Sequence, residues 1–298
     1  MFLARKFEFE SAHFYNFGGK LKNLHGHNYE VWVIVKGKIN DLGMVMNISE
    51  IKEKVNPIIE RFDHTLLNSM PEFEGLNPTV EIISKVLYEN VKGVLENVYS
   101  VKVFEDEDVF GAYDGKNNLL GSFKWLNFNG ATWKYETWVK GYLDNRGIVE
   151  DLKGIFTSPK RFFERYERVE DKGGYILVRG ERLNFKTYKF SAAHILGLKT
   201  FKYEENLKVF GKCAKRESHG HNYLLVVFSK DDKAFSKAER VVKEFDHNIL
   251  NDFIDNPTLE NIAEYIFNKT QADILKIYET PRTYAVISKN HSEIIPAI

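Results

Sequence analysis

Eight of the nine histidines in this chain of 298 residues fall into two sets of four that have the same order and similar surroundings. In each set two of the histidines flank a glycine, so on a β-strand both imidazoles would point to the same side. Neutral imidazole is a common metal ligand, and we therefore expect one metal site in each set. The two sets are His13, His25, His27 and His64, and His194, His219, His221 and His247.

The third ligand of each predicted site is the histidine that ends the preceding strand, His13 or His194. Three neutral imidazoles leave a fourth position open, which is typical of catalytic zinc. The chain has one cysteine, which excludes a cysteine-rich structural site, and no carboxylate in the motif completes the facial triad of iron enzymes. We therefore predict one Zn²⁺ in each set. Two buried histidines bonded to the backbone are the structural alternative, and the duplication argues against it.

Cys213 lies six positions before His219, in the sequence GKCAKRESHGH. We expect this loop to fold back over the metal, where a cation would lower the thiol pKa and make the thiolate a base or nucleophile. The alternative is a buried cysteine that serves as a small apolar residue. The neighbours Lys212, Lys215 and Arg216 argue against burial.

Each set also contains an Asp-His pair and a glutamate. A carboxylate beside an imidazole raises its basicity, so Asp63–His64 and Asp246–His247 are candidate proton relays. A helix-capping aspartate beside a solvated histidine is the alternative. The glutamates end a strand, where a carboxylate can hydrogen-bond a cyclic amidine or guanidine, or can be an exposed edge charge. These glutamates are Glu105 and Glu279.

All these residues belong to a tandem repeat. FESAH, HGHNY, FDHTLLN, NPTVE and VKVFED return in the same order as FSAAH, HGHNY, FDHNILN, NPTLE and LKIYET. Strands are predicted at 29–35 and 223–228, and helices at 48–62 and 235–245 and after each NPT, where Asn77 and Asn256 suit the N-cap. The order β-β-α-α-β-β predicts an α+β fold, an antiparallel sheet with helices on one face.

The length fits two domains, and 43% hydrophobic residues suffice for a core in each. We predict modules at residues 1–115 and 184–298, joined by a connecting region at 116–183. The second repeat lacks the stretch that corresponds to DLGMVMNISEIK from Asp41. The similar stretch YLDNRGIVEDLKGI from Tyr142 either completes the second module or is an ordinary insertion between domains.

The charge balance and the hydropathy of the chain argue against nucleic acid and membrane as partners. Basic and acidic residues number 42 each, so the net charge of zero indicates no affinity for nucleic acid or an anionic membrane. No apolar run approaches the length of a membrane span, and the N-terminus has no apolar signal core. A single cysteine also fits a reducing compartment. We expect a cytoplasmic protein that binds a small molecule, not nucleic acid or membrane.

With these motifs, the chain resembles the 6-pyruvoyl tetrahydropterin synthase family, which includes the 6-carboxy-tetrahydropterin synthases of queuosine and archaeosine biosynthesis. The resemblance rests on FSAAH, ENLKVFGKC, HGHNY, FDHNILN and IYET and covers residues 7–113 and 184–288. It implies the tunnelling fold (T-fold), with an antiparallel four-stranded sheet and two helices on one face in each module. It also implies homo-oligomers in which the edges of the sheets join to form barrels.

The resemblance further implies a role for each residue of the second repeat. Zinc would bind His194, His219 and His221, and Cys213 would be the base that moves protons on the substrate side chain. Asp246 and His247 would be the partner acid–base pair, reached across a domain or subunit interface. Glu279 would anchor the pterin ring, with Thr280 beside it. The substrate would be 7,8-dihydroneopterin triphosphate, and a lyase reaction would eliminate triphosphate and form 6-pyruvoyl tetrahydropterin.

The spacing from Cys213 to His219 is similar to that of the pyruvoyl-forming branch, whereas the carboxy-forming branch has a shorter spacing. A 6-carboxy-tetrahydropterin synthase of 7-deazapurine biosynthesis and a non-catalytic pterin-binding protein are the alternatives. The first repeat keeps its zinc ligands but has Gly19 and Leu21 at the two candidate cysteine positions. It therefore either lends Asp63, His64 or Glu105 to the second site, or binds pterin without turnover.

Overall fold

The computed structural model describes residues 1–17, 20–21, 23–106, 109–128, 131–141, 143, 162–170, 174–178, 181–292 and 295. The chain divides into two compact units, and each unit consists of three separate segments of the sequence. Unit 1 consists of Met1–Ala4, Lys36–Asn47 and Asn184–Ser292. Unit 2 consists of Arg5–Val35, Ile48–Leu183 and Glu293–Ile298. Each unit contains one of the two histidine sets.

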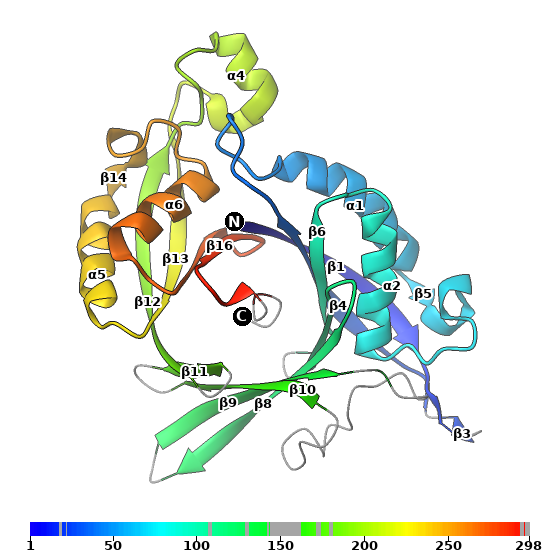
Figure 1. Ribbon diagram of the computed structural model, residues 1–298. Coiled ribbons are helices and arrows are strands. Elements are labelled where there is room, and N and C mark those ends of the chain that lie inside the picture. Colours follow the sequence, from blue (N-terminus) through cyan, green and yellow to red (C-terminus); the bar gives the residue numbers. More distant parts are fainter. Residues whose placement is uncertain are drawn as a thin grey trace. The chain divides into compact units, whose positions relative to one another are not determined.

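Unit 2 carries the first repeat. Its strands follow the order β7-β6-β4-β1, and the β4–β6 and β6–β7 pairs are antiparallel. Two helices lie together on one face of these strands (Figure 1). The elements are β1 (Phe2–His13), β4 (His25–Lys36), α1 (Ile48–Phe62), α2 (Val80–Lys92), β6 (Val98–Phe104) and β7 (Val109–Tyr113). Short elements are β2 (Asn16–Phe17), β3 (Lys20–Leu21), β5 (Thr65–Leu66) and the 3-10 turns Leu67–Ser69 and Pro71–Phe73.

The sheet of unit 2 does not end at the fourth strand. Four further strands continue from β7, each antiparallel to its neighbour. The region predicted as a connection therefore contains sheet. The stretch from Tyr142 that could complete the second module lies outside the described residues, apart from residue 143. The added strands are β8 (Asn118–Phe128), β9 (Ala131–Gly141), β10 (Phe162–Glu170) and β11 (Tyr175–Val178).

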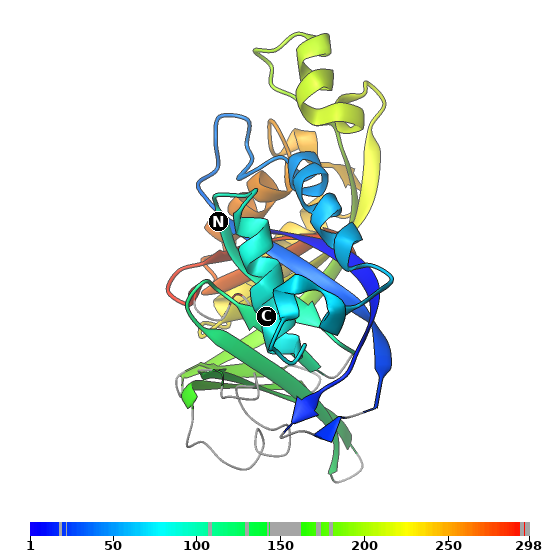
Figure 2. The ribbon, with the colours of Figure 1, turned by 90° about the vertical axis from the view of Figure 1, so that its right-hand side faces the viewer.

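Unit 1 carries the second repeat. Its strands follow the order β16-β15-β13-β12-β14, antiparallel except for the parallel β12–β14 pair. Helices α5 and α6 cover one face, and α4 lies beyond the ends of β12 and β13 (Figure 2). The elements are β12 (Glu181–His194), α4 (Tyr203–Phe210), the 3-10 turn Gly211–Ala214, β13 (His219–Ser229), α5 (Lys233–Phe245), β14 (Asn248–Ile249), the 3-10 turn Leu250–Asp252, α6 (Leu259–Thr270), β15 (Ile274–Thr280) and β16 (Thr283–Ser288).

The two repeats bury the same aromatic core beneath their helices. In unit 2 the ring of Phe9 stacks on Tyr29 at 4.8 Å and also contacts Phe62 of α1. In unit 1 the ring of Phe190 stacks on Tyr223 at 4.9 Å and contacts Phe245 of α5. These large buried rings hold β1 and β4 against α1 in unit 2, and β12 and β13 against α5 in unit 1. Within the described residues, no helix is long and apolar enough to cross a membrane.

The predicted N-caps of the second helices are wrong by two residues. Thr79 caps α2, where its hydroxyl accepts a hydrogen bond from the Ile82 N–H, and Thr258 caps α6 in the same way. Threonine at this position satisfies a helix N–H that would otherwise lack a partner. The asparagines instead hold the loop that follows the first strand of each repeat. Asn77 Oδ1 accepts from the N–H of Asn16, and Asn256 Oδ1 accepts from the N–H of Gly197.

Candidate metal and substrate site

The register of β12 and β13 brings the second histidine set together. Ala192 pairs with His221 and His194 pairs with His219, so the three imidazoles stand on one face of the sheet. One nitrogen of each of the three rings lies within 4.8 Å of the others. In the first set, the same is true of His13, His25 and His27. Each set therefore forms a compact group that could hold a metal ion.

The deepest imidazole of each group is oriented by a backbone carbonyl. His194 is fully buried, and its Nδ1 lies 2.9 Å from the oxygen of Pro257. A carbonyl can only accept, so Nδ1 carries the hydrogen and the lone pair of Nε2 faces His219, 3.0 Å away. Burial lowers the pKa of His194 to about 4, which keeps the ring neutral. His13 has the same arrangement with Pro78.

A carboxylate lies inside the first group. Glu105 Oε1 is 3.0 Å from Nε2 of His27 and 3.3 Å from Nε2 of His13. The hydroxyl of Tyr15 donates to the same oxygen at 3.2 Å. Burial by itself raises the pKa of Glu105, but the neighbouring His13 and His27 outweigh it, so the pKa is lowered and the carboxylate ionised. The positions counted back from His25 cannot be compared with Cys213, because Gly19 and the side chain of Leu21 lie outside the described residues.

In the second group the corresponding carboxylate is farther from the imidazoles. Glu279 Oε1 lies 3.8 Å from Nε2 of His194 and 3.9 Å from Nε2 of His221. Burial raises the pKa of Glu279 to about 7. Glu279 is the penultimate residue of β15, and Thr280 is the last. A largely buried carboxyl therefore lies near two of the three imidazoles, at distances longer than those of Glu105.

Cys213 lies near Glu279 of the second repeat. It lies in the 3-10 turn after α4, and its thiol is close enough to Glu279 for their charges to interact. The thiol is half-buried, although its basic neighbours argued for exposure. Burial, and then the charge of Glu279, raise the pKa of the thiol. A nearby cation would be needed to reverse that shift and form the thiolate near neutral pH.

The Asp-His pairs have the same geometry in both repeats. Asp246 Oδ1 accepts from the N–H of Ser191 at 2.9 Å, and Asp246 Oδ2 lies 3.0 Å from Nδ1 of His247. His247 has a left-handed backbone with φ of 59°, and its N–H donates to the oxygen of Ser191. In the first repeat, Asp63 Oδ1 accepts from the N–H of Glu10, and Asp63 Oδ2 lies 2.9 Å from Nδ1 of His64. The N–H of His64 donates to the oxygen of Glu10. Each pair is therefore held against the first strand of its own repeat, with an exposed imidazole.

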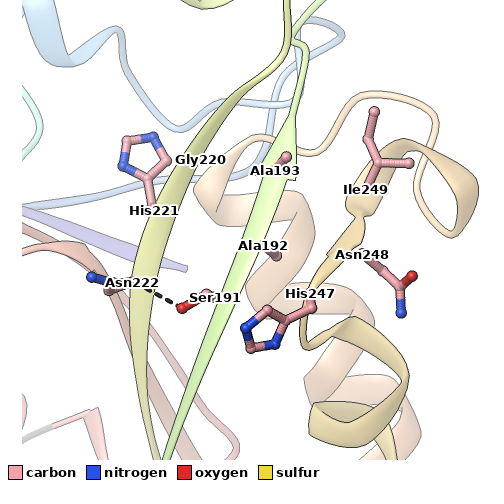
Figure 3. Close-up of a pocket in the computed structure, with 9 residues that line it drawn as sticks. All are labelled: Ser191, Ala192, Ala193, Gly220, His221, Asn222, His247, Asn248 and Ile249. Atoms are coloured by element: carbon pink, nitrogen blue, oxygen red, sulfur yellow. Dashed lines mark hydrogen bonds between the residues drawn. The ribbon is translucent and has the colours of Figure 1, made fainter.

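The structure does not direct His247 towards the imidazole group of its own repeat. Both His221 and His247 line a pocket of about 530 Å³. The ring of His221 points away from that of His247 (Figure 3). The register explains this, because Ser191 pairs with Asn222 on one face while His221 projects from the other. The structure therefore does not bring Asp246–His247 together with the three imidazoles of its own repeat (Figure 3).

Comparison with known proteins identifies the family. The sequence profile described as 6-pyruvoyl tetrahydropterin synthase matches residues 2–116 and 184–290, once in each repeat. The chain belongs to the 6-pyruvoyl tetrahydropterin synthase family. It is therefore an enzyme of the tetrahydropterin synthase type, with the family domain present twice.

Relatives within this family carry two different names. The chain is 38% identical to the 6-pyruvoyl tetrahydrobiopterin synthase of Dictyostelium discoideum over 33% of this chain and 76% of that protein. It is equally identical, 38%, to a putative 6-carboxy-5,6,7,8-tetrahydropterin synthase of Archaeoglobus fulgidus, over 34% of this chain and 84% of that protein. A solved 6-pyruvoyl tetrahydropterin synthase of Caenorhabditis elegans is 23% identical, covering 39% of this chain and 96% of its own, with a TM-score of 0.37. The names of the Dictyostelium and Archaeoglobus relatives leave the product open.

One feature of the second site is supplied by the first repeat. Residues Lys36–Asn47 precede α1 in the sequence but belong to unit 1. Met44 packs with Phe210, which precedes the Cys213 turn, and with Ala214, the last residue of that turn. The sequence showed that the second repeat lacks its own copy of this stretch. The first repeat's copy occupies unit 1, a placement that sequence reasoning missed.

Hydrogen bonds between the backbone of this segment and side chains of α6 and its N-cap hold the segment at the start of that helix. The N–H of Val45 donates to Glu260 Oε1 at 2.9 Å, and the hydroxyl of Thr258 donates to the oxygen of Gly43 at 2.6 Å. Gly43 has φ of +78°, and a Cβ there would approach Nδ2 of Asn261 to 2.4 Å, so glycine is required at this position. The segment therefore joins the Cys213 turn to the start of α6.

Proposed function

We propose that this chain is a zinc-dependent lyase that converts 7,8-dihydroneopterin triphosphate into 6-pyruvoyl tetrahydropterin at the site of the second repeat. The observation that supports this most is a group of three imidazoles in unit 1, with Glu279 3.8 Å from His194 and Cys213 near enough to Glu279 for their charges to interact. A base, a carboxyl for ring binding and a set of metal ligands are the parts that this reaction needs. Family membership supports the pterin substrate.

The ligand set of this site suits zinc. His194, His219 and His221 offer three nitrogen ligands, and the backbone contact of His194 leaves its Nε2 lone pair free for a metal. When bound, zinc polarises the hydroxyl and carbonyl oxygens of the substrate side chain and so eases proton removal from carbon. The proposal includes one Zn²⁺ in each repeat, with the first repeat using His13, His25 and His27.

The remaining steps are assigned to the chain's own residues. Cys213 removes and returns protons on the substrate side chain. Glu279 binds the pterin ring through its amidine edge, with Thr280 beside it. Asp246–His247, or the equivalent Asp63–His64, exchanges the other proton from a neighbouring copy of the fold. The direction of His247, away from His221 of its own repeat, supports this assignment (Figure 3).

The pyruvoyl product is favoured by the six positions from Cys213 to His219. The alternative is a 6-carboxy-tetrahydropterin synthase of 7-deazapurine biosynthesis, which the name of the Archaeoglobus relative supports. A non-catalytic pterin-binding protein is the third reading. Two T-fold modules, at 1–115 and 184–298, homo-oligomers formed through sheet edges and a cytoplasmic location remain part of the same proposal.

The test is turnover of dihydroneopterin triphosphate with analysis of the product by mass spectrometry. We expect a pyruvoyl side chain and released triphosphate, and a loss of about 10²–10⁴-fold in kcat for Cys213→Ala, because a positioned base contributes about that much. Zinc content should stay unchanged in this variant. Cys213→Ser, which keeps a smaller polar group, is the matched control and should retain more activity than alanine.

Any other outcome of this assay would favour a different function or a different base. A Cys213→Ala enzyme with the wild-type rate would contradict the assignment of the base. Acetaldehyde release would favour the carboxy-forming alternative. Wild-type protein that binds pterin but releases no triphosphate would favour the binding protein.

A further inference from the structure

The two imidazole groups differ in the position of their glutamates. Glu105 and Glu279 occupy equivalent places in the two repeats, after VKVF and LKIY. Glu105 Oε1 approaches His27 Nε2 to 3.0 Å, whereas Glu279 Oε1 lies 3.9 Å from the equivalent His221 nitrogen. In the first repeat a carboxylate oxygen joins three imidazole nitrogens within 4.8 Å, and the corresponding group of the second repeat contains imidazoles alone. The first repeat therefore offers four donor atoms.

Three of the distances between these donors are close to the ligand separations of one tetrahedral ion. With bonds of about 2.0–2.1 Å, two ligands of a tetrahedral zinc are about 3.3–3.4 Å apart. In the first repeat His13 Nε2 lies 3.1 Å from His25 Nε2 and 3.3 Å from Glu105 Oε1. The distances of 3.8 and 3.9 Å from Glu279 to its imidazoles exceed this separation by about half an ångström. The first carboxylate is thus placed as a ligand.

The contact between His27 and Glu105 does not have hydrogen-bond geometry. His27 Nε2 is buried and has no hydrogen-bond partner among the described residues, although Glu105 Oε1 is 3.0 Å away. Leaving a buried nitrogen unsatisfied is costly. Two acceptor atoms that approach so closely without a shared hydrogen are expected where both point at a cation between them.

A tyrosine holds the carboxylate in this position. The Tyr15 hydroxyl donates to Glu105 Oε1 at 3.2 Å, and its ring packs edge-on against His13 at 4.8 Å. The equivalent residue of the second repeat, two positions after His194, is Leu196. Leucine has no donor, and Leu196 instead packs into the apolar cluster beside the Cys213 turn. The difference between the two glutamates therefore follows from a difference in sequence.

We propose that the first repeat holds a closed, four-ligand zinc site in which Glu105 is the fourth ligand and Tyr15 its positioning residue. Such a site has no open position for a substrate oxygen and serves structure rather than turnover. A carboxylate that binds zinc cannot also hold a pterin ring, so this role competes with the substrate-binding role predicted for Glu105 from the sequence.

Cobalt(II) in place of zinc tests the proposal without any change to Glu105. Tetrahedral cobalt has visible absorption that shifts when an exogenous anion enters an open position. With His219→Ala and His221→Ala, only the first site remains, and we expect a four-coordinate spectrum that azide leaves unchanged. With His25→Ala and His27→Ala, only the second site remains, and azide should shift its spectrum. An azide-induced shift in the first protein would overturn the closed site.

Matched glutamate variants measure the fourth ligand directly. In the protein that keeps only the first site, Glu105→Gln should weaken zinc binding by more than about tenfold, since even outer-shell changes cost that much. Glu279→Gln in the protein that keeps only the second site should change zinc affinity by less than Glu105→Gln. Tyr15→Phe should shift the cobalt spectrum of the first site. Equal effects of the two glutamine variants would overturn the proposal.

The competing role of Glu105 has its own readout. Neopterin is titrated into the protein that keeps only the first site, loaded with zinc. We expect no saturable binding. Binding that Glu105→Gln abolishes would return this residue to the pterin ring and overturn the closed site. Activity of the second site does not enter any of these measurements, so failure of this inference and failure of the proposed lyase can be told apart.

Discussion

The pKa values of two histidines of the repeated pattern, His194 and His64, are shifted in opposite directions. His194 is buried against the Pro257 carbonyl, and burial lowers its pKa to about 4. His64 is exposed beside Asp63, whose hydrogen bond and charge raise the pKa of the imidazole. The unfolded chain binds more protons than the native one at His194 between about pH 4 and 6.5, so its contribution to stability falls as pH falls through that window. A neutral His194 is what a metal ligand requires.

This contrast can be measured residue by residue. We expect NMR titration of the metal-free protein to show His64 taking up its proton above pH 6.5 and His194 only near pH 4. Asp63→Asn should lower the pKa of His64 towards its ordinary value and leave that of His194 unchanged, because the charge partner alone is removed. A His194 ring that titrates together with His64 would contradict the burial argument.

At the scale of elements, the segment Lys36–Asn47 links the first repeat to the chemistry of the second. Its Met44 is buried against Phe210 and Ala214, which lie on either side of Cys213 in the sequence. Its backbone is fixed at the start of α6 by Glu260, whose pKa burial raises to about 7. The position of the thiol therefore depends on residues more than 160 places earlier in the chain, as the bond from Asn47 to Val209 also shows.

Met44→Ala should loosen the Cys213 turn. Truncating a buried methionine costs about 2–5 kcal/mol, and each 1.4 kcal/mol lost from closure of the turn exposes it about tenfold more often. Cys213 is the single cysteine, so its reaction rate with a chromogenic thiol reagent reports this opening. We expect a rise of about tenfold or more. Met46→Ala, two residues along, is the matched control, and an unchanged rate in Met44→Ala would show that the segment does not support the turn.

At the scale of the whole molecule, the two copies of the family domain carry different side chains at equivalent sites. Unit 1 keeps a thiol and an open imidazole group, and unit 2 keeps an imidazole group with Glu105 inside it. Both units keep an Asp-His pair that is held on the first strand of its repeat. Under the proposed function, a proton relay from His247 would serve an imidazole group other than that of its own repeat, because its ring points away from His221 (Figure 3).

Replacement of both relay histidines tests this arrangement. We expect His64→Ala with His247→Ala to lower kcat by about 10²–10⁴-fold, the usual contribution of a general acid or base, with the zinc content unchanged. The single variant that loses as much as the double one identifies the pair in use. A double variant with the wild-type rate would remove both pairs from the mechanism.

Much of this protein could be predicted from local sequence. The repeat, the His-Gly-His strands and the helices with buried Ile51, Val55 and Phe62 all follow from short-range periodicity and motif order. The positions of the three imidazoles in each group follow as well, because alternate residues of one strand must share a face. The caps of α2 and α6 were missed by two residues, since both asparagine and threonine suit an N-cap and only the contacts of the preceding loop decide between them.

The rest was decided by tertiary contacts. Strands β8 and β9 lie where the sequence was interpreted as a connection. Strand β8 pairs with β7 and β9 pairs with β8, so the sheet continues beyond the strands of the repeat. The placement of Lys36–Asn47 in unit 1 and the direction of Glu105 towards His27 depend on partners distant in the sequence. Sequence alone indicated the candidate residues for the chemistry, since residue types and spacing are local. Only the tertiary structure decided which carboxylate lies among the imidazoles, because burial and donors such as Tyr15 set side-chain direction.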